Sequence, residues 1–416
     1  MQNKKQCLLC GSSSVKELKD FGMQPVTNRF PESKDKKEYL YPMVFDQCQS
    51  CSLLQLRSVM PASEMQPQVD WITYNEPEEH LDGLALTLGK LQGLTHDSKI
   101  VGITFKDDTL LNRLKKQGFK NISRLKELDD LGITAKGVGV ESIQEKITAK
   151  NLPMLIEKYG RPDFIVARHI VEHAHDLKDF AHTLHQWAAP GGYVFFEAPD
   201  CTRSLDAFDY STLWEEHAAY FTPDTYRNSL EYLGFKEAYF ENYPYPLENS
   251  LIYVGKTVTP PMKSKLSETV LSKELARGNR FAAELPRIAS MFQELLSEVN
   301  KSGHKLAIFG AGHLACTFVN LLGLDHFFEF AVDDHPKKKG LYLPGSKMSI
   351  LGSSELIPQN IKVCFTTLSK ESEAKVVAKN QAYFNHGGIF ISIFTDVRTI
   401  QATLETIVKN PVRNTK

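Results

Sequence analysis

The sequence predicts an α/β protein with a small cysteine-rich module, a larger domain around a mostly parallel sheet, and a second, smaller α/β domain. Apolar strand-like runs alternate with amphipathic helix-like segments over residues 80–255, and the alternation starts again after Gly303. Two close cysteine pairs near the N-terminus indicate the small module. A chain of 416 residues has room for about two or three such domains.

The composition is that of an ordinary globular protein. Hydrophobic residues make up 42% and charged residues 24% of the chain, and 49 Lys and Arg nearly balance 50 Asp and Glu. Balanced charge creates no field that attracts nucleic acid or an anionic membrane, so we expect neither as a partner. No apolar run reaches the roughly 18 residues of a membrane span. The N-terminal stretch MQNKKQCLLCGSSS lacks the apolar core of a signal peptide, so we expect a cytoplasmic location.

The cysteines indicate metal binding and not a disulfide framework. The pairs Cys7-x-x-Cys10 and Cys48-x-x-Cys51 each place two thiolates on one tight turn, and together they complete a tetrahedral zinc site. Reduced thiols in a small core, or a redox pair, are the alternative. Because four thiolates leave no open coordination position, we expect a structural zinc ion and no catalysis at it.

We place the domain boundaries where the sequence pattern changes. Residues 1–70 hold the cysteines, turns and short strands, and residues 71–258 hold the alternating strands and helices of the larger domain. Residues 259–302 have helical periodicity interrupted once, at Pro286, and predict one or two connecting helices. Residues 303–410 form the smaller α/β domain, and the tail NPVRNTK is expected to be disordered.

The turn after the first predicted strand of the larger domain has no glycine. In nucleotide-binding folds, glycines there let the backbone approach a cofactor and expose the N–H groups of a helix N-terminus. The stretch KIVGITFKDDTLLNRLKKQGF, residues 99–119, instead carries at this turn Thr104, Phe105, Lys106, Asp107 and Asp108.

The stretch EEHAAYFTPDTY places Glu216 and His217 shortly before Tyr220. A carboxylate beside an imidazole can orient the ring and set its pKa near neutrality, as general base catalysis requires. A helix-start cluster in contact with solvent is the alternative interpretation.

The stretch ARHIVEHAHDL places His169, Glu172 and His173 at the carboxyl end of a predicted parallel strand. Ligands of open α/β sheets bind at such ends. Two histidines at i and i+4 could bind a metal on a helix, but this spacing is more often coincidence, so we predict no metal there.

The stretch FGAGHLA, with an aspartate pair after the next strand, resembles half of a dinucleotide fingerprint. Ala315 occupies the third glycine position, so the match is partial. The exposed N–H groups of such a turn suit a phosphate or pyrophosphate, and we favour a sugar nucleotide or a scaffold role over NAD. The candidate contacts are Gly310, Gly312, His313 and Asp333.

Taken together, these segments resemble the three-part bacterial sugar C-methyltransferases, which add a methyl group to C-3 of a dTDP-linked 4-keto deoxysugar. The resemblance covers nearly the whole chain, through CLLCGS, DFGMQPVTNRF, FDQCQSCSLLQL, PDFIVARHIVEHAHDL, FEAPD, WEEHAAYFTPDTYRNSLEYLGF, FGAGHLA and VDDHPKKKGLYLPGSKMSI. It implies a class I methyltransferase-like Rossmann domain, a Rossmann-like C-terminal domain, a structural zinc ion, S-adenosylmethionine and a nucleotide-linked sugar of dTDP type.

The resemblance also implies roles for single residues. The family's H-E-H-x-x-Y-F falls on residues 215–221, so its Glu-His pair is retained as Glu216 and His217, and Glu215 replaces its first His. His217 would be the base that removes the C-3 proton, with His173 or Tyr220 stabilising the negative charge that develops. The family's N-N-V-L-A-H falls on residues 168–173, which keep the last His and lose both asparagines. Tyr74 corresponds loosely to a tyrosine in an aromatic segment of the family.

The methyl donor site departs from the family in three places. The family's E-I-G-S-N-D-G-T-L-L falls on residues 102–111, where both glycines and the acidic residue are replaced, and the asparagine on the adenine side is lost. Leu125 replaces the carboxylate that would hold the ribose, with Glu127 two residues away. We expect Phe105 to fill space that the cofactor needs and Asp108 to disfavour a positive φ. The remaining candidate contacts are Thr104, Lys106, Asp107 and Arg168.

Three functions follow as hypotheses. The first is a sugar-nucleotide C-methyltransferase-like enzyme acting at the carbon α to a keto group. The second keeps the His-Glu pair without a methyl donor, as an epimerase or tautomerase of a keto-sugar nucleotide. The third is a non-catalytic scaffold or partner of an active paralogue.

Overall fold

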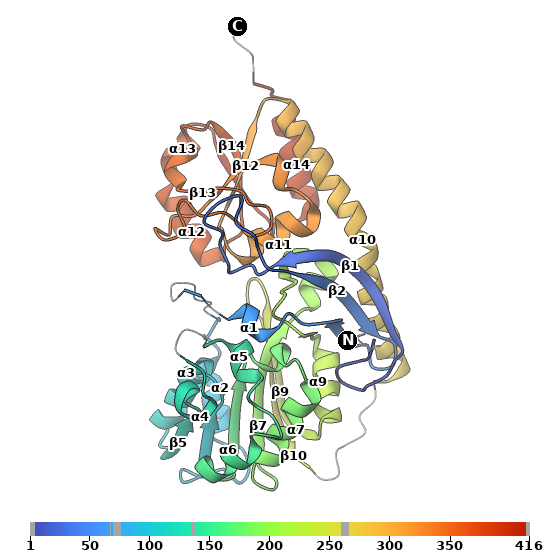
Figure 1. Ribbon diagram of the computed structural model, residues 1–416, viewed down its shortest axis with the longest axis vertical. Coiled ribbons are helices and arrows are strands. Elements are labelled where there is room, and N and C mark those ends of the chain that lie inside the picture. The colour runs from blue at the N-terminus through green and yellow to red at the C-terminus, as the bar shows by residue number, and fades with distance from the viewer. Residues whose placement is uncertain (1–4, 67, 70–75, 135–137, 259–265, 413–416) are drawn as a thin grey trace. The chain divides into compact units, whose positions relative to one another are not determined.

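The alternating strands and helices fold into two units, each with its own α/β sheet (Figure 1). The first unit comprises residues 1–20, 43–203 and 216–279, and the second comprises residues 21–42, 204–215 and 280–416. The structure is a computed structural model that describes residues 5–66, 68–69, 76–134, 138–258 and 266–412. The α/β fold class predicted from the sequence is confirmed.

A six-stranded sheet in the order β5-β4-β6-β7-β10-β9 forms the centre of the first unit. Its first four strands are parallel. Strand β10 is antiparallel to β7, and β9 is antiparallel to β10, so β9 runs in the same direction as the first four. The strands are β4 (Lys99–Gly102), β5 (Asn121–Arg124), β6 (Phe164–Arg168), β7 (Tyr193–Asp200), β9 (Phe235–Tyr243) and β10 (Asn249–Thr257). The buried runs of β6 and β7 are apolar because both faces of the sheet are covered.

Helices cover both faces of this sheet (Figure 1). On one face, α2 and α3 pack on it. Leu110, Leu111 and Leu114 of α3 are buried, while its lysines point outward. The opposite face is covered by α5, α6, α7 and α9. The bounds are α2 (Leu81–Leu88), α3 (Asp108–Lys116), α4 (Glu127–Leu131), α5 (Val140–Gln144), α6 (Leu152–Tyr159), α7 (Leu177–Trp187), α8 (Thr202–Ala207) and α9 (Pro223–Tyr232).

A second, four-stranded sheet has the order β1-β2-β3-β8. Its strands are β1 (Val15–Pro25), β2 (Leu40–Cys48), β3 (Leu54–Leu56) and β8 (Ala219–Tyr220), and α1 (Ala62–Met65) follows β3. The strand–helix alternation predicts a strand at the stretch KGVGVES, and the structure differs here. The described part of this stretch forms the fully buried helix α5, with Gly139 at the N-cap.

One helix, α10 (Glu268–Lys301), connects to the C-terminal sheet and contains Pro286. That sheet is parallel in the order β13-β12-β11-β14-β15. Its strands are β11 (Lys305–Phe309), β12 (Phe328–Val332), β13 (Ile350–Leu351), β14 (Ile361–Thr366) and β15 (Ile389–Ser392). Its helices are α11 (His313–Leu322), α12 (Lys370–Lys379), α13 (Gln381–Asn385) and α14 (Val397–Val408).

Short 3₁₀ helices complete the secondary structure: η1 (Phe105–Asp107), η3 (Val171–His173), η4 (Tyr210–Thr212), η5 (Asp325–Phe327) and η6 (Ser353–Glu355). Within the described ranges, no helix combines the length and the apolar character that crossing a membrane requires.

Candidate functional site

The four paired cysteines converge on one point. The Sγ atoms of Cys7 and Cys51 lie 3.5 Å apart, those of Cys10 and Cys48 lie 3.6 Å apart, and all four lie within 4.8 Å of one another. Zn–S bonds of 2.3 Å in a tetrahedron require sulfur atoms about 3.8 Å apart. The cluster therefore has the size of a zinc site.

Backbone N–H groups also support this cluster. The N–H of Cys10 donates to the sulfur of Cys7, and the N–H of Ser50 donates to the sulfur of Cys48. Hydrogen bonds from Cys51 and Cys7 hold the pKa of Cys48 well below its ordinary value. Donors aimed at sulfur favour the thiolate, which is the form that binds metal.

The ligand-binding crevice of the first unit's sheet is predicted by topology. From β4 the chain moves outward to β5 and then returns to β6 on the other side of β4. In open α/β sheets, ligands bind outside the carboxyl ends of the strands at this switch point. The crevice is therefore expected between Gly102, at the end of β4, and Arg168, at the end of β6.

Asp107 bridges these two strand ends. Its Oδ2 accepts hydrogen bonds from the N–H groups of Ile103 (2.7 Å) and Thr104 (2.8 Å), and its Oδ1 accepts one from the N–H of Arg168 (2.9 Å). Its side chain is fully buried, and this burial raises its pKa to about 7. The N–H groups that could hold a ligand at the switch point are thus already bonded within the chain.

The side chain of Arg168 lies across the same turn. Its Nη1 donates to the carbonyl oxygen of Lys106 (2.6 Å) and to Oγ1 of Thr109 (3.0 Å), while its Nε lies 2.5 Å from Oε2 of Glu197. Arg168 and Glu197 are direct neighbours on β6 and β7, and their side chains are 1% and 0% exposed. This buried ion pair occupies the crevice.

Two histidines also contact Glu197 of the buried ion pair. Nε2 of His80 lies 3.1 Å and Nε2 of His169 lies 3.3 Å from Oε1 of Glu197. Burial lowers the pKa of His169, but the charges of Glu76 and Glu197 outweigh this effect and raise it to about 10. Burial raises the pKa of Glu197, and Arg168 and His169 hold it well below its ordinary value.

The other residues that correspond to the methyl donor site are also buried or contact other residues of the chain. Leu125 is fully buried, and Glu127 binds Arg124 at 2.5 Å. Lys106 holds Glu76 at 2.6 Å. Thr104 is buried and caps η1 through its side chain.

The structure shows the state of two further residues of this turn. Phe105 is 42% exposed. Asp108 has φ −54°, an ordinary helical value that agrees with its expected avoidance of a positive φ, because the turn enters η1 and α3 directly.

A second cluster lies beside this crevice, where η3 meets the loop before β8. His173 and His217 pack edge to face, with ring centroids 4.6 Å apart. Ligand atoms of Glu172, His173 and His217 lie within 4.8 Å of one another, as do those of Glu141, His173 and Glu216. His217 is half-buried, whereas the other four side chains are buried. The structure thus brings together Glu216, His217 and His173, and adds Glu141, which sequence analysis missed.

Tyr220 lies at the edge of the same cluster. Its ring centroid is 5.8 Å from that of His217, and it packs edge to face on Phe45. Only 2% of Tyr220 is exposed. Tyr74 lies outside the described residues.

In the second unit, the glycine turn joins β11 to α11. Gly310 has φ 98°, and a Cβ there would lie 2.7 Å from Oγ1 of Thr367, so the turn needs glycine. Gly312 is the N-cap of α11. Asp333 pairs with Lys338 at 2.9 Å.

His313 is buried in a cluster that the sequence did not indicate. Its ring stacks on Trp214 with centroids 3.8 Å apart, and its Nδ1 lies 2.9 Å from Oγ1 of Thr27. The same hydroxyl donates to Glu215 at 2.9 Å. Burial lowers the pKa of His313 to about 3, so its ring is neutral. Glu215, at the first position of the Glu-Glu-His stretch, therefore contributes to packing in the second unit.

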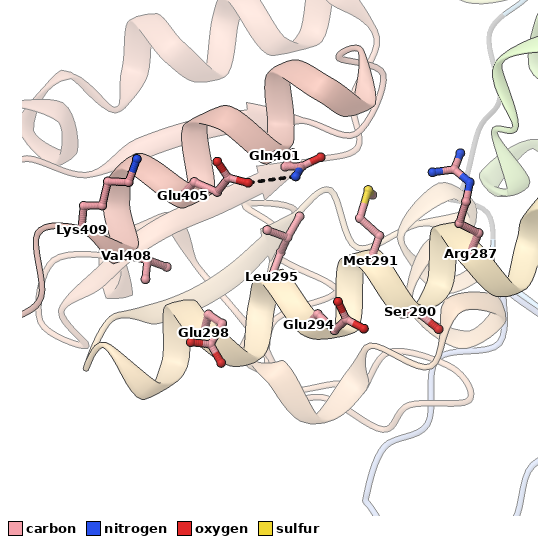
Figure 2. A pocket seen from close by; sticks show the side chains of 10 residues that line it. All are labelled: Arg287, Ser290, Met291, Glu294, Leu295, Glu298, Gln401, Glu405, Val408 and Lys409. Carbon is pink, nitrogen blue, oxygen red and sulfur yellow. Dashed lines mark hydrogen bonds between the residues drawn. The ribbon is translucent and has the colours of Figure 1, made fainter.

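Figure 2 shows a cavity of about 600 Å³ between α10 and α14. Its lining residues are Arg287, Ser290, Met291, Glu294, Leu295, Glu298, Gln401, Glu405, Val408 and Lys409. None of them is a histidine or a cysteine, so the lining provides neither an imidazole base nor a thiolate. We assign no chemistry to this cavity.

Comparison with known families agrees with this arrangement. A model described as a zinc binding domain matches residues 7–65, a methyltransferase domain matches residues 123–238, and a C-methyltransferase C-terminal domain matches residues 264–394. The C-methyltransferase NovU of Streptomyces niveus is 21% identical over 409 residues, which are 95% of this chain and 97% of that protein.

Solved methyltransferases share parts of the fold. The 1,6-didemethyltoxoflavin-N1-methyltransferase of Burkholderia thailandensis is 10% identical, with a TM-score of 0.29 over 43% of this chain and 77% of that one. The magnesium protoporphyrin IX methyltransferase of Synechocystis PCC 6803 is 15% identical, with a TM-score of 0.30 over 44% and 83%. Both contain S-adenosylhomocysteine. Likeness at this level carries no inference about the ligand of this chain.

Sheet topology and cysteine cluster define a zinc-binding protein with a methyltransferase-type domain. The order of the three matched domains describes the chain more closely: it is an enzyme with methyltransferase domains and is similar to C-methyltransferases over 95% of its length.

The family implies a structural zinc ion and S-adenosylmethionine. The four thiolates fit zinc in number, spacing and chemistry. The crevice as it stands does not fit the methyl donor, because Arg168 crosses it and Asp107 holds its N–H groups. A ligand there would have to displace a buried ion pair.

We expect the cysteine cluster to bind one metal ion and to depend on Cys48. Cobalt bound to thiolates gives an intense charge-transfer absorption, so Co²⁺ titration reports on this site alone. Cys48→Ser should lose this absorption, and Cys201→Ser, a buried cysteine outside the cluster, should keep it. An unchanged spectrum in Cys48→Ser would contradict the assignment.

Arg168→Met should destabilise the first unit by about 3 kcal/mol, because it leaves the buried Glu197 carboxylate without its partner. Arg227→Met is the matched control: Arg227 pairs with Glu237 while 46% of its side chain is exposed, so we expect a loss below about 1 kcal/mol. Urea unfolding measures both values. Equal losses would show that burial adds nothing to the Arg168 pair.

The wild-type chain should give no binding heat with S-adenosylmethionine at about 1 mM, because binding requires Arg168 to leave Glu197. Isothermal titration tests this, with a donor-binding methyltransferase as the control for the titrant. Saturable binding with a Kd near 10 μM, roughly −7 kcal/mol, would mean that the crevice opens readily.

Proposed function

We propose that this chain removes the proton from the carbon next to the keto group of a nucleotide-linked deoxysugar, with His217 as the base and Glu216 as the carboxylate that assists it. The observation that carries the proposal is the placement of a half-buried imidazole among buried carboxylates and a second imidazole. Partial exposure lets a substrate reach His217, while burial of its neighbours keeps the cluster ordered.

The proposed step balances within the chain and its substrate. The C–H bond breaks, its proton moves to a ring nitrogen of His217, and its electrons form the enolate of the sugar. His173, whose ring lies 4.6 Å from that of His217, is placed to stabilise the negative oxygen. This step is shared by C-methylation and by epimerisation, so it fits the family without depending on the donor.

Epimerisation or tautomerisation is the second candidate, and the crevice favours it. Because Arg168, Asp107 and Glu197 fill the switch point, the electrophile that the site itself provides is the proton on His217. Return of this proton to the other face of the carbon inverts the centre, and its return to oxygen gives the enol.

In the second unit, the turn of Gly310 and Gly312 leads into α11, and the N-terminus of this helix is proposed to bind a phosphate group of a nucleotide. The N–H groups of Gly310 and Gly312 themselves donate to the carbonyl oxygens of Val332 and Gly310. A dTDP-type sugar is proposed from the family resemblance. Asp333 is engaged by Lys338, so its role would be to hold that lysine near the turn, where Lys338 also donates to the carbonyl oxygen of Ala311 at 2.7 Å.

Incubation of the chain with a dTDP-4-keto-6-deoxysugar in D₂O, without S-adenosylmethionine, should exchange the proton α to the keto group. His217→Gln should slow this exchange at least about 100-fold, because a positioned base contributes 10²–10⁴. His182→Gln is the matched control, since His182 is exposed on α7 in the same unit. NMR or mass spectrometry follows the deuterium.

Exchange that proceeds equally in His217→Gln would remove the base from this proposal. The scaffold hypothesis would gain if the wild-type chain showed no exchange across several keto-sugar nucleotides.

A further inference from the structure

We propose that Glu141, His173 and Glu216 bind one divalent metal ion, separate from the zinc of the cysteine cluster. Their ligand atoms lie within 4.8 Å of one another. Ligands at about 2.1 Å from an octahedral ion lie about 3.0–4.2 Å apart, so the three atoms need only small movements to close on it. All three side chains are buried, with 6%, 5% and 6% of their surface exposed.

The three ligands come from segments that are tied to one another. His173 ends η3, Glu141 lies in α5, and Glu216 precedes β8. The N–H of Ala218 donates to the carbonyl oxygen of Glu172 at 2.7 Å, which fixes the Glu216 loop to η3. The N–H of His175 donates to the side-chain Oε1 of Gln144 at 3.0 Å, which fixes the chain just after η3 to α5. One main-chain and one side-chain hydrogen bond therefore hold the three segments together.

The imidazole of His173 points to a ligand. Its Nδ1 makes no hydrogen bond, although the ring is 95% buried and Oε1 of Glu141 lies 3.2 Å away. Its Nε2 lies 3.9 Å from Oε1 of Glu172, on another carboxylate. Proteins commonly bind a metal through one imidazole nitrogen while a carboxylate holds the other, which fixes the tautomer. Glu172 would hold Nε2–H and leave the lone pair of Nδ1 to the ion.

The negative charge of the buried carboxylates in this region also favours binding of a cation. Glu141, Glu172 and Glu216 are all buried, and Oε2 of Glu172 has no hydrogen bond. The neighbouring cations are already engaged: Lys106 binds Glu76 at 2.6 Å, and Nε2 of His169 lies 3.3 Å from Glu197. A divalent ion would compensate carboxylates whose burial is otherwise unfavourable.

Two carboxylates and one imidazole suit Mn²⁺, Fe²⁺ or Zn²⁺, and they leave coordination positions open. Resting on the proposed function, the ion held by His173 would bind the keto oxygen and stabilise the enolate as a Lewis acid, so that His173 acts on that oxygen through the ion while His217 removes the proton. A histidine base beside a divalent cation is an established solution for enolate chemistry. Glu216 would then assist His217 through the ion.

The test uses the full chain with its cysteine cluster loaded with zinc, and Mn²⁺ as the probe. Isothermal titration and Mn²⁺ electron paramagnetic resonance should show one ion bound per chain. Glu141→Gln and Glu216→Gln should each weaken this binding at least about 10-fold, because each removes one ligand charge. Glu145→Gln is the matched control, since Glu145 is exposed next to α5 and lies outside the cluster.

Thermal unfolding provides the second measurement and detects variants that fail to fold. Mn²⁺ should raise the Tm of the wild type and of Glu145→Gln but not that of Glu141→Gln. Absence of Mn²⁺, Co²⁺ and Zn²⁺ binding beyond the cysteine cluster in the folded wild type overturns the proposal. Equal Mn²⁺ binding by the wild type and both ligand variants overturns it as well.

The two proposals fail separately. Mn²⁺ binding without proton exchange on keto-sugar nucleotides leaves the metal site standing and removes the proposed function. Proton exchange that persists at full rate in EDTA, in a chain that binds no Mn²⁺, removes the metal site and leaves the base at His217.

Discussion

The ion pair between Arg168 and Glu197 is the constraint on which the candidate site depends. It joins two neighbouring parallel strands at their carboxyl ends, and both partners are excluded from water. A buried guanidinium depends on partners within the chain, and Nη1 of Arg168 finds them on the turn after β4 while its Nη2 makes no hydrogen bond. The pair therefore closes the crevice and also fixes the turn that would otherwise receive a ligand.

The same pair shapes the chain that follows. His169 takes φ 47°, a left-handed value that is uncommon outside glycine, and its N–H donates to the carbonyl oxygen of Glu197. The chain thus turns sharply after β6, so that Glu172 and His173 lie in η3 instead of in a continuing helix. This is why His169 and His173 do not share one helical face. His169 lies against Glu197, while His173 lies against His217.

The sequence was informative where structure depends on local spacing. Two C-x-x-C pairs each indicate a zinc knuckle, and the short apolar runs of β4, β6 and β7 between helical segments indicate buried strands. It was less informative where a side chain's direction decides the outcome. The sequence shows that the turn lost its glycines, but it does not reveal that Phe105 is 42% exposed. Arg168 replaces an asparagine in the sequence, and its contacts with the turn after β4 and with Glu197 on another strand appear only in the structure.

Glu141 shows why the rest of the site could not be read from the sequence. It lies in a glycine-rich stretch that the alternation makes a strand, and nothing nearby marks it as a ligand. Its candidate role as a ligand is visible only in the folded chain, where α5 packs on η3 and the carboxylate of Glu141 lies 3.2 Å from His173. Sites built from separate segments depend on tertiary packing, which no short motif encodes.

The crevice and the base cluster are adjacent but use different residues, and this separation allows one to change while the other persists. Arg168 pairs with Glu197, and Asp107 accepts a hydrogen bond from the N–H of Arg168, so both carboxylates at the switch point have partners. The carboxylates around His173 are not balanced in the same way. Among the described residues, Nη2 of Arg168 lacks a hydrogen bond at the switch point, and Nδ1 of His173 and Oε2 of Glu172 lack one in the base cluster. An enolate formed in the base cluster would need a positive partner. A cation bound by these carboxylates would be that partner.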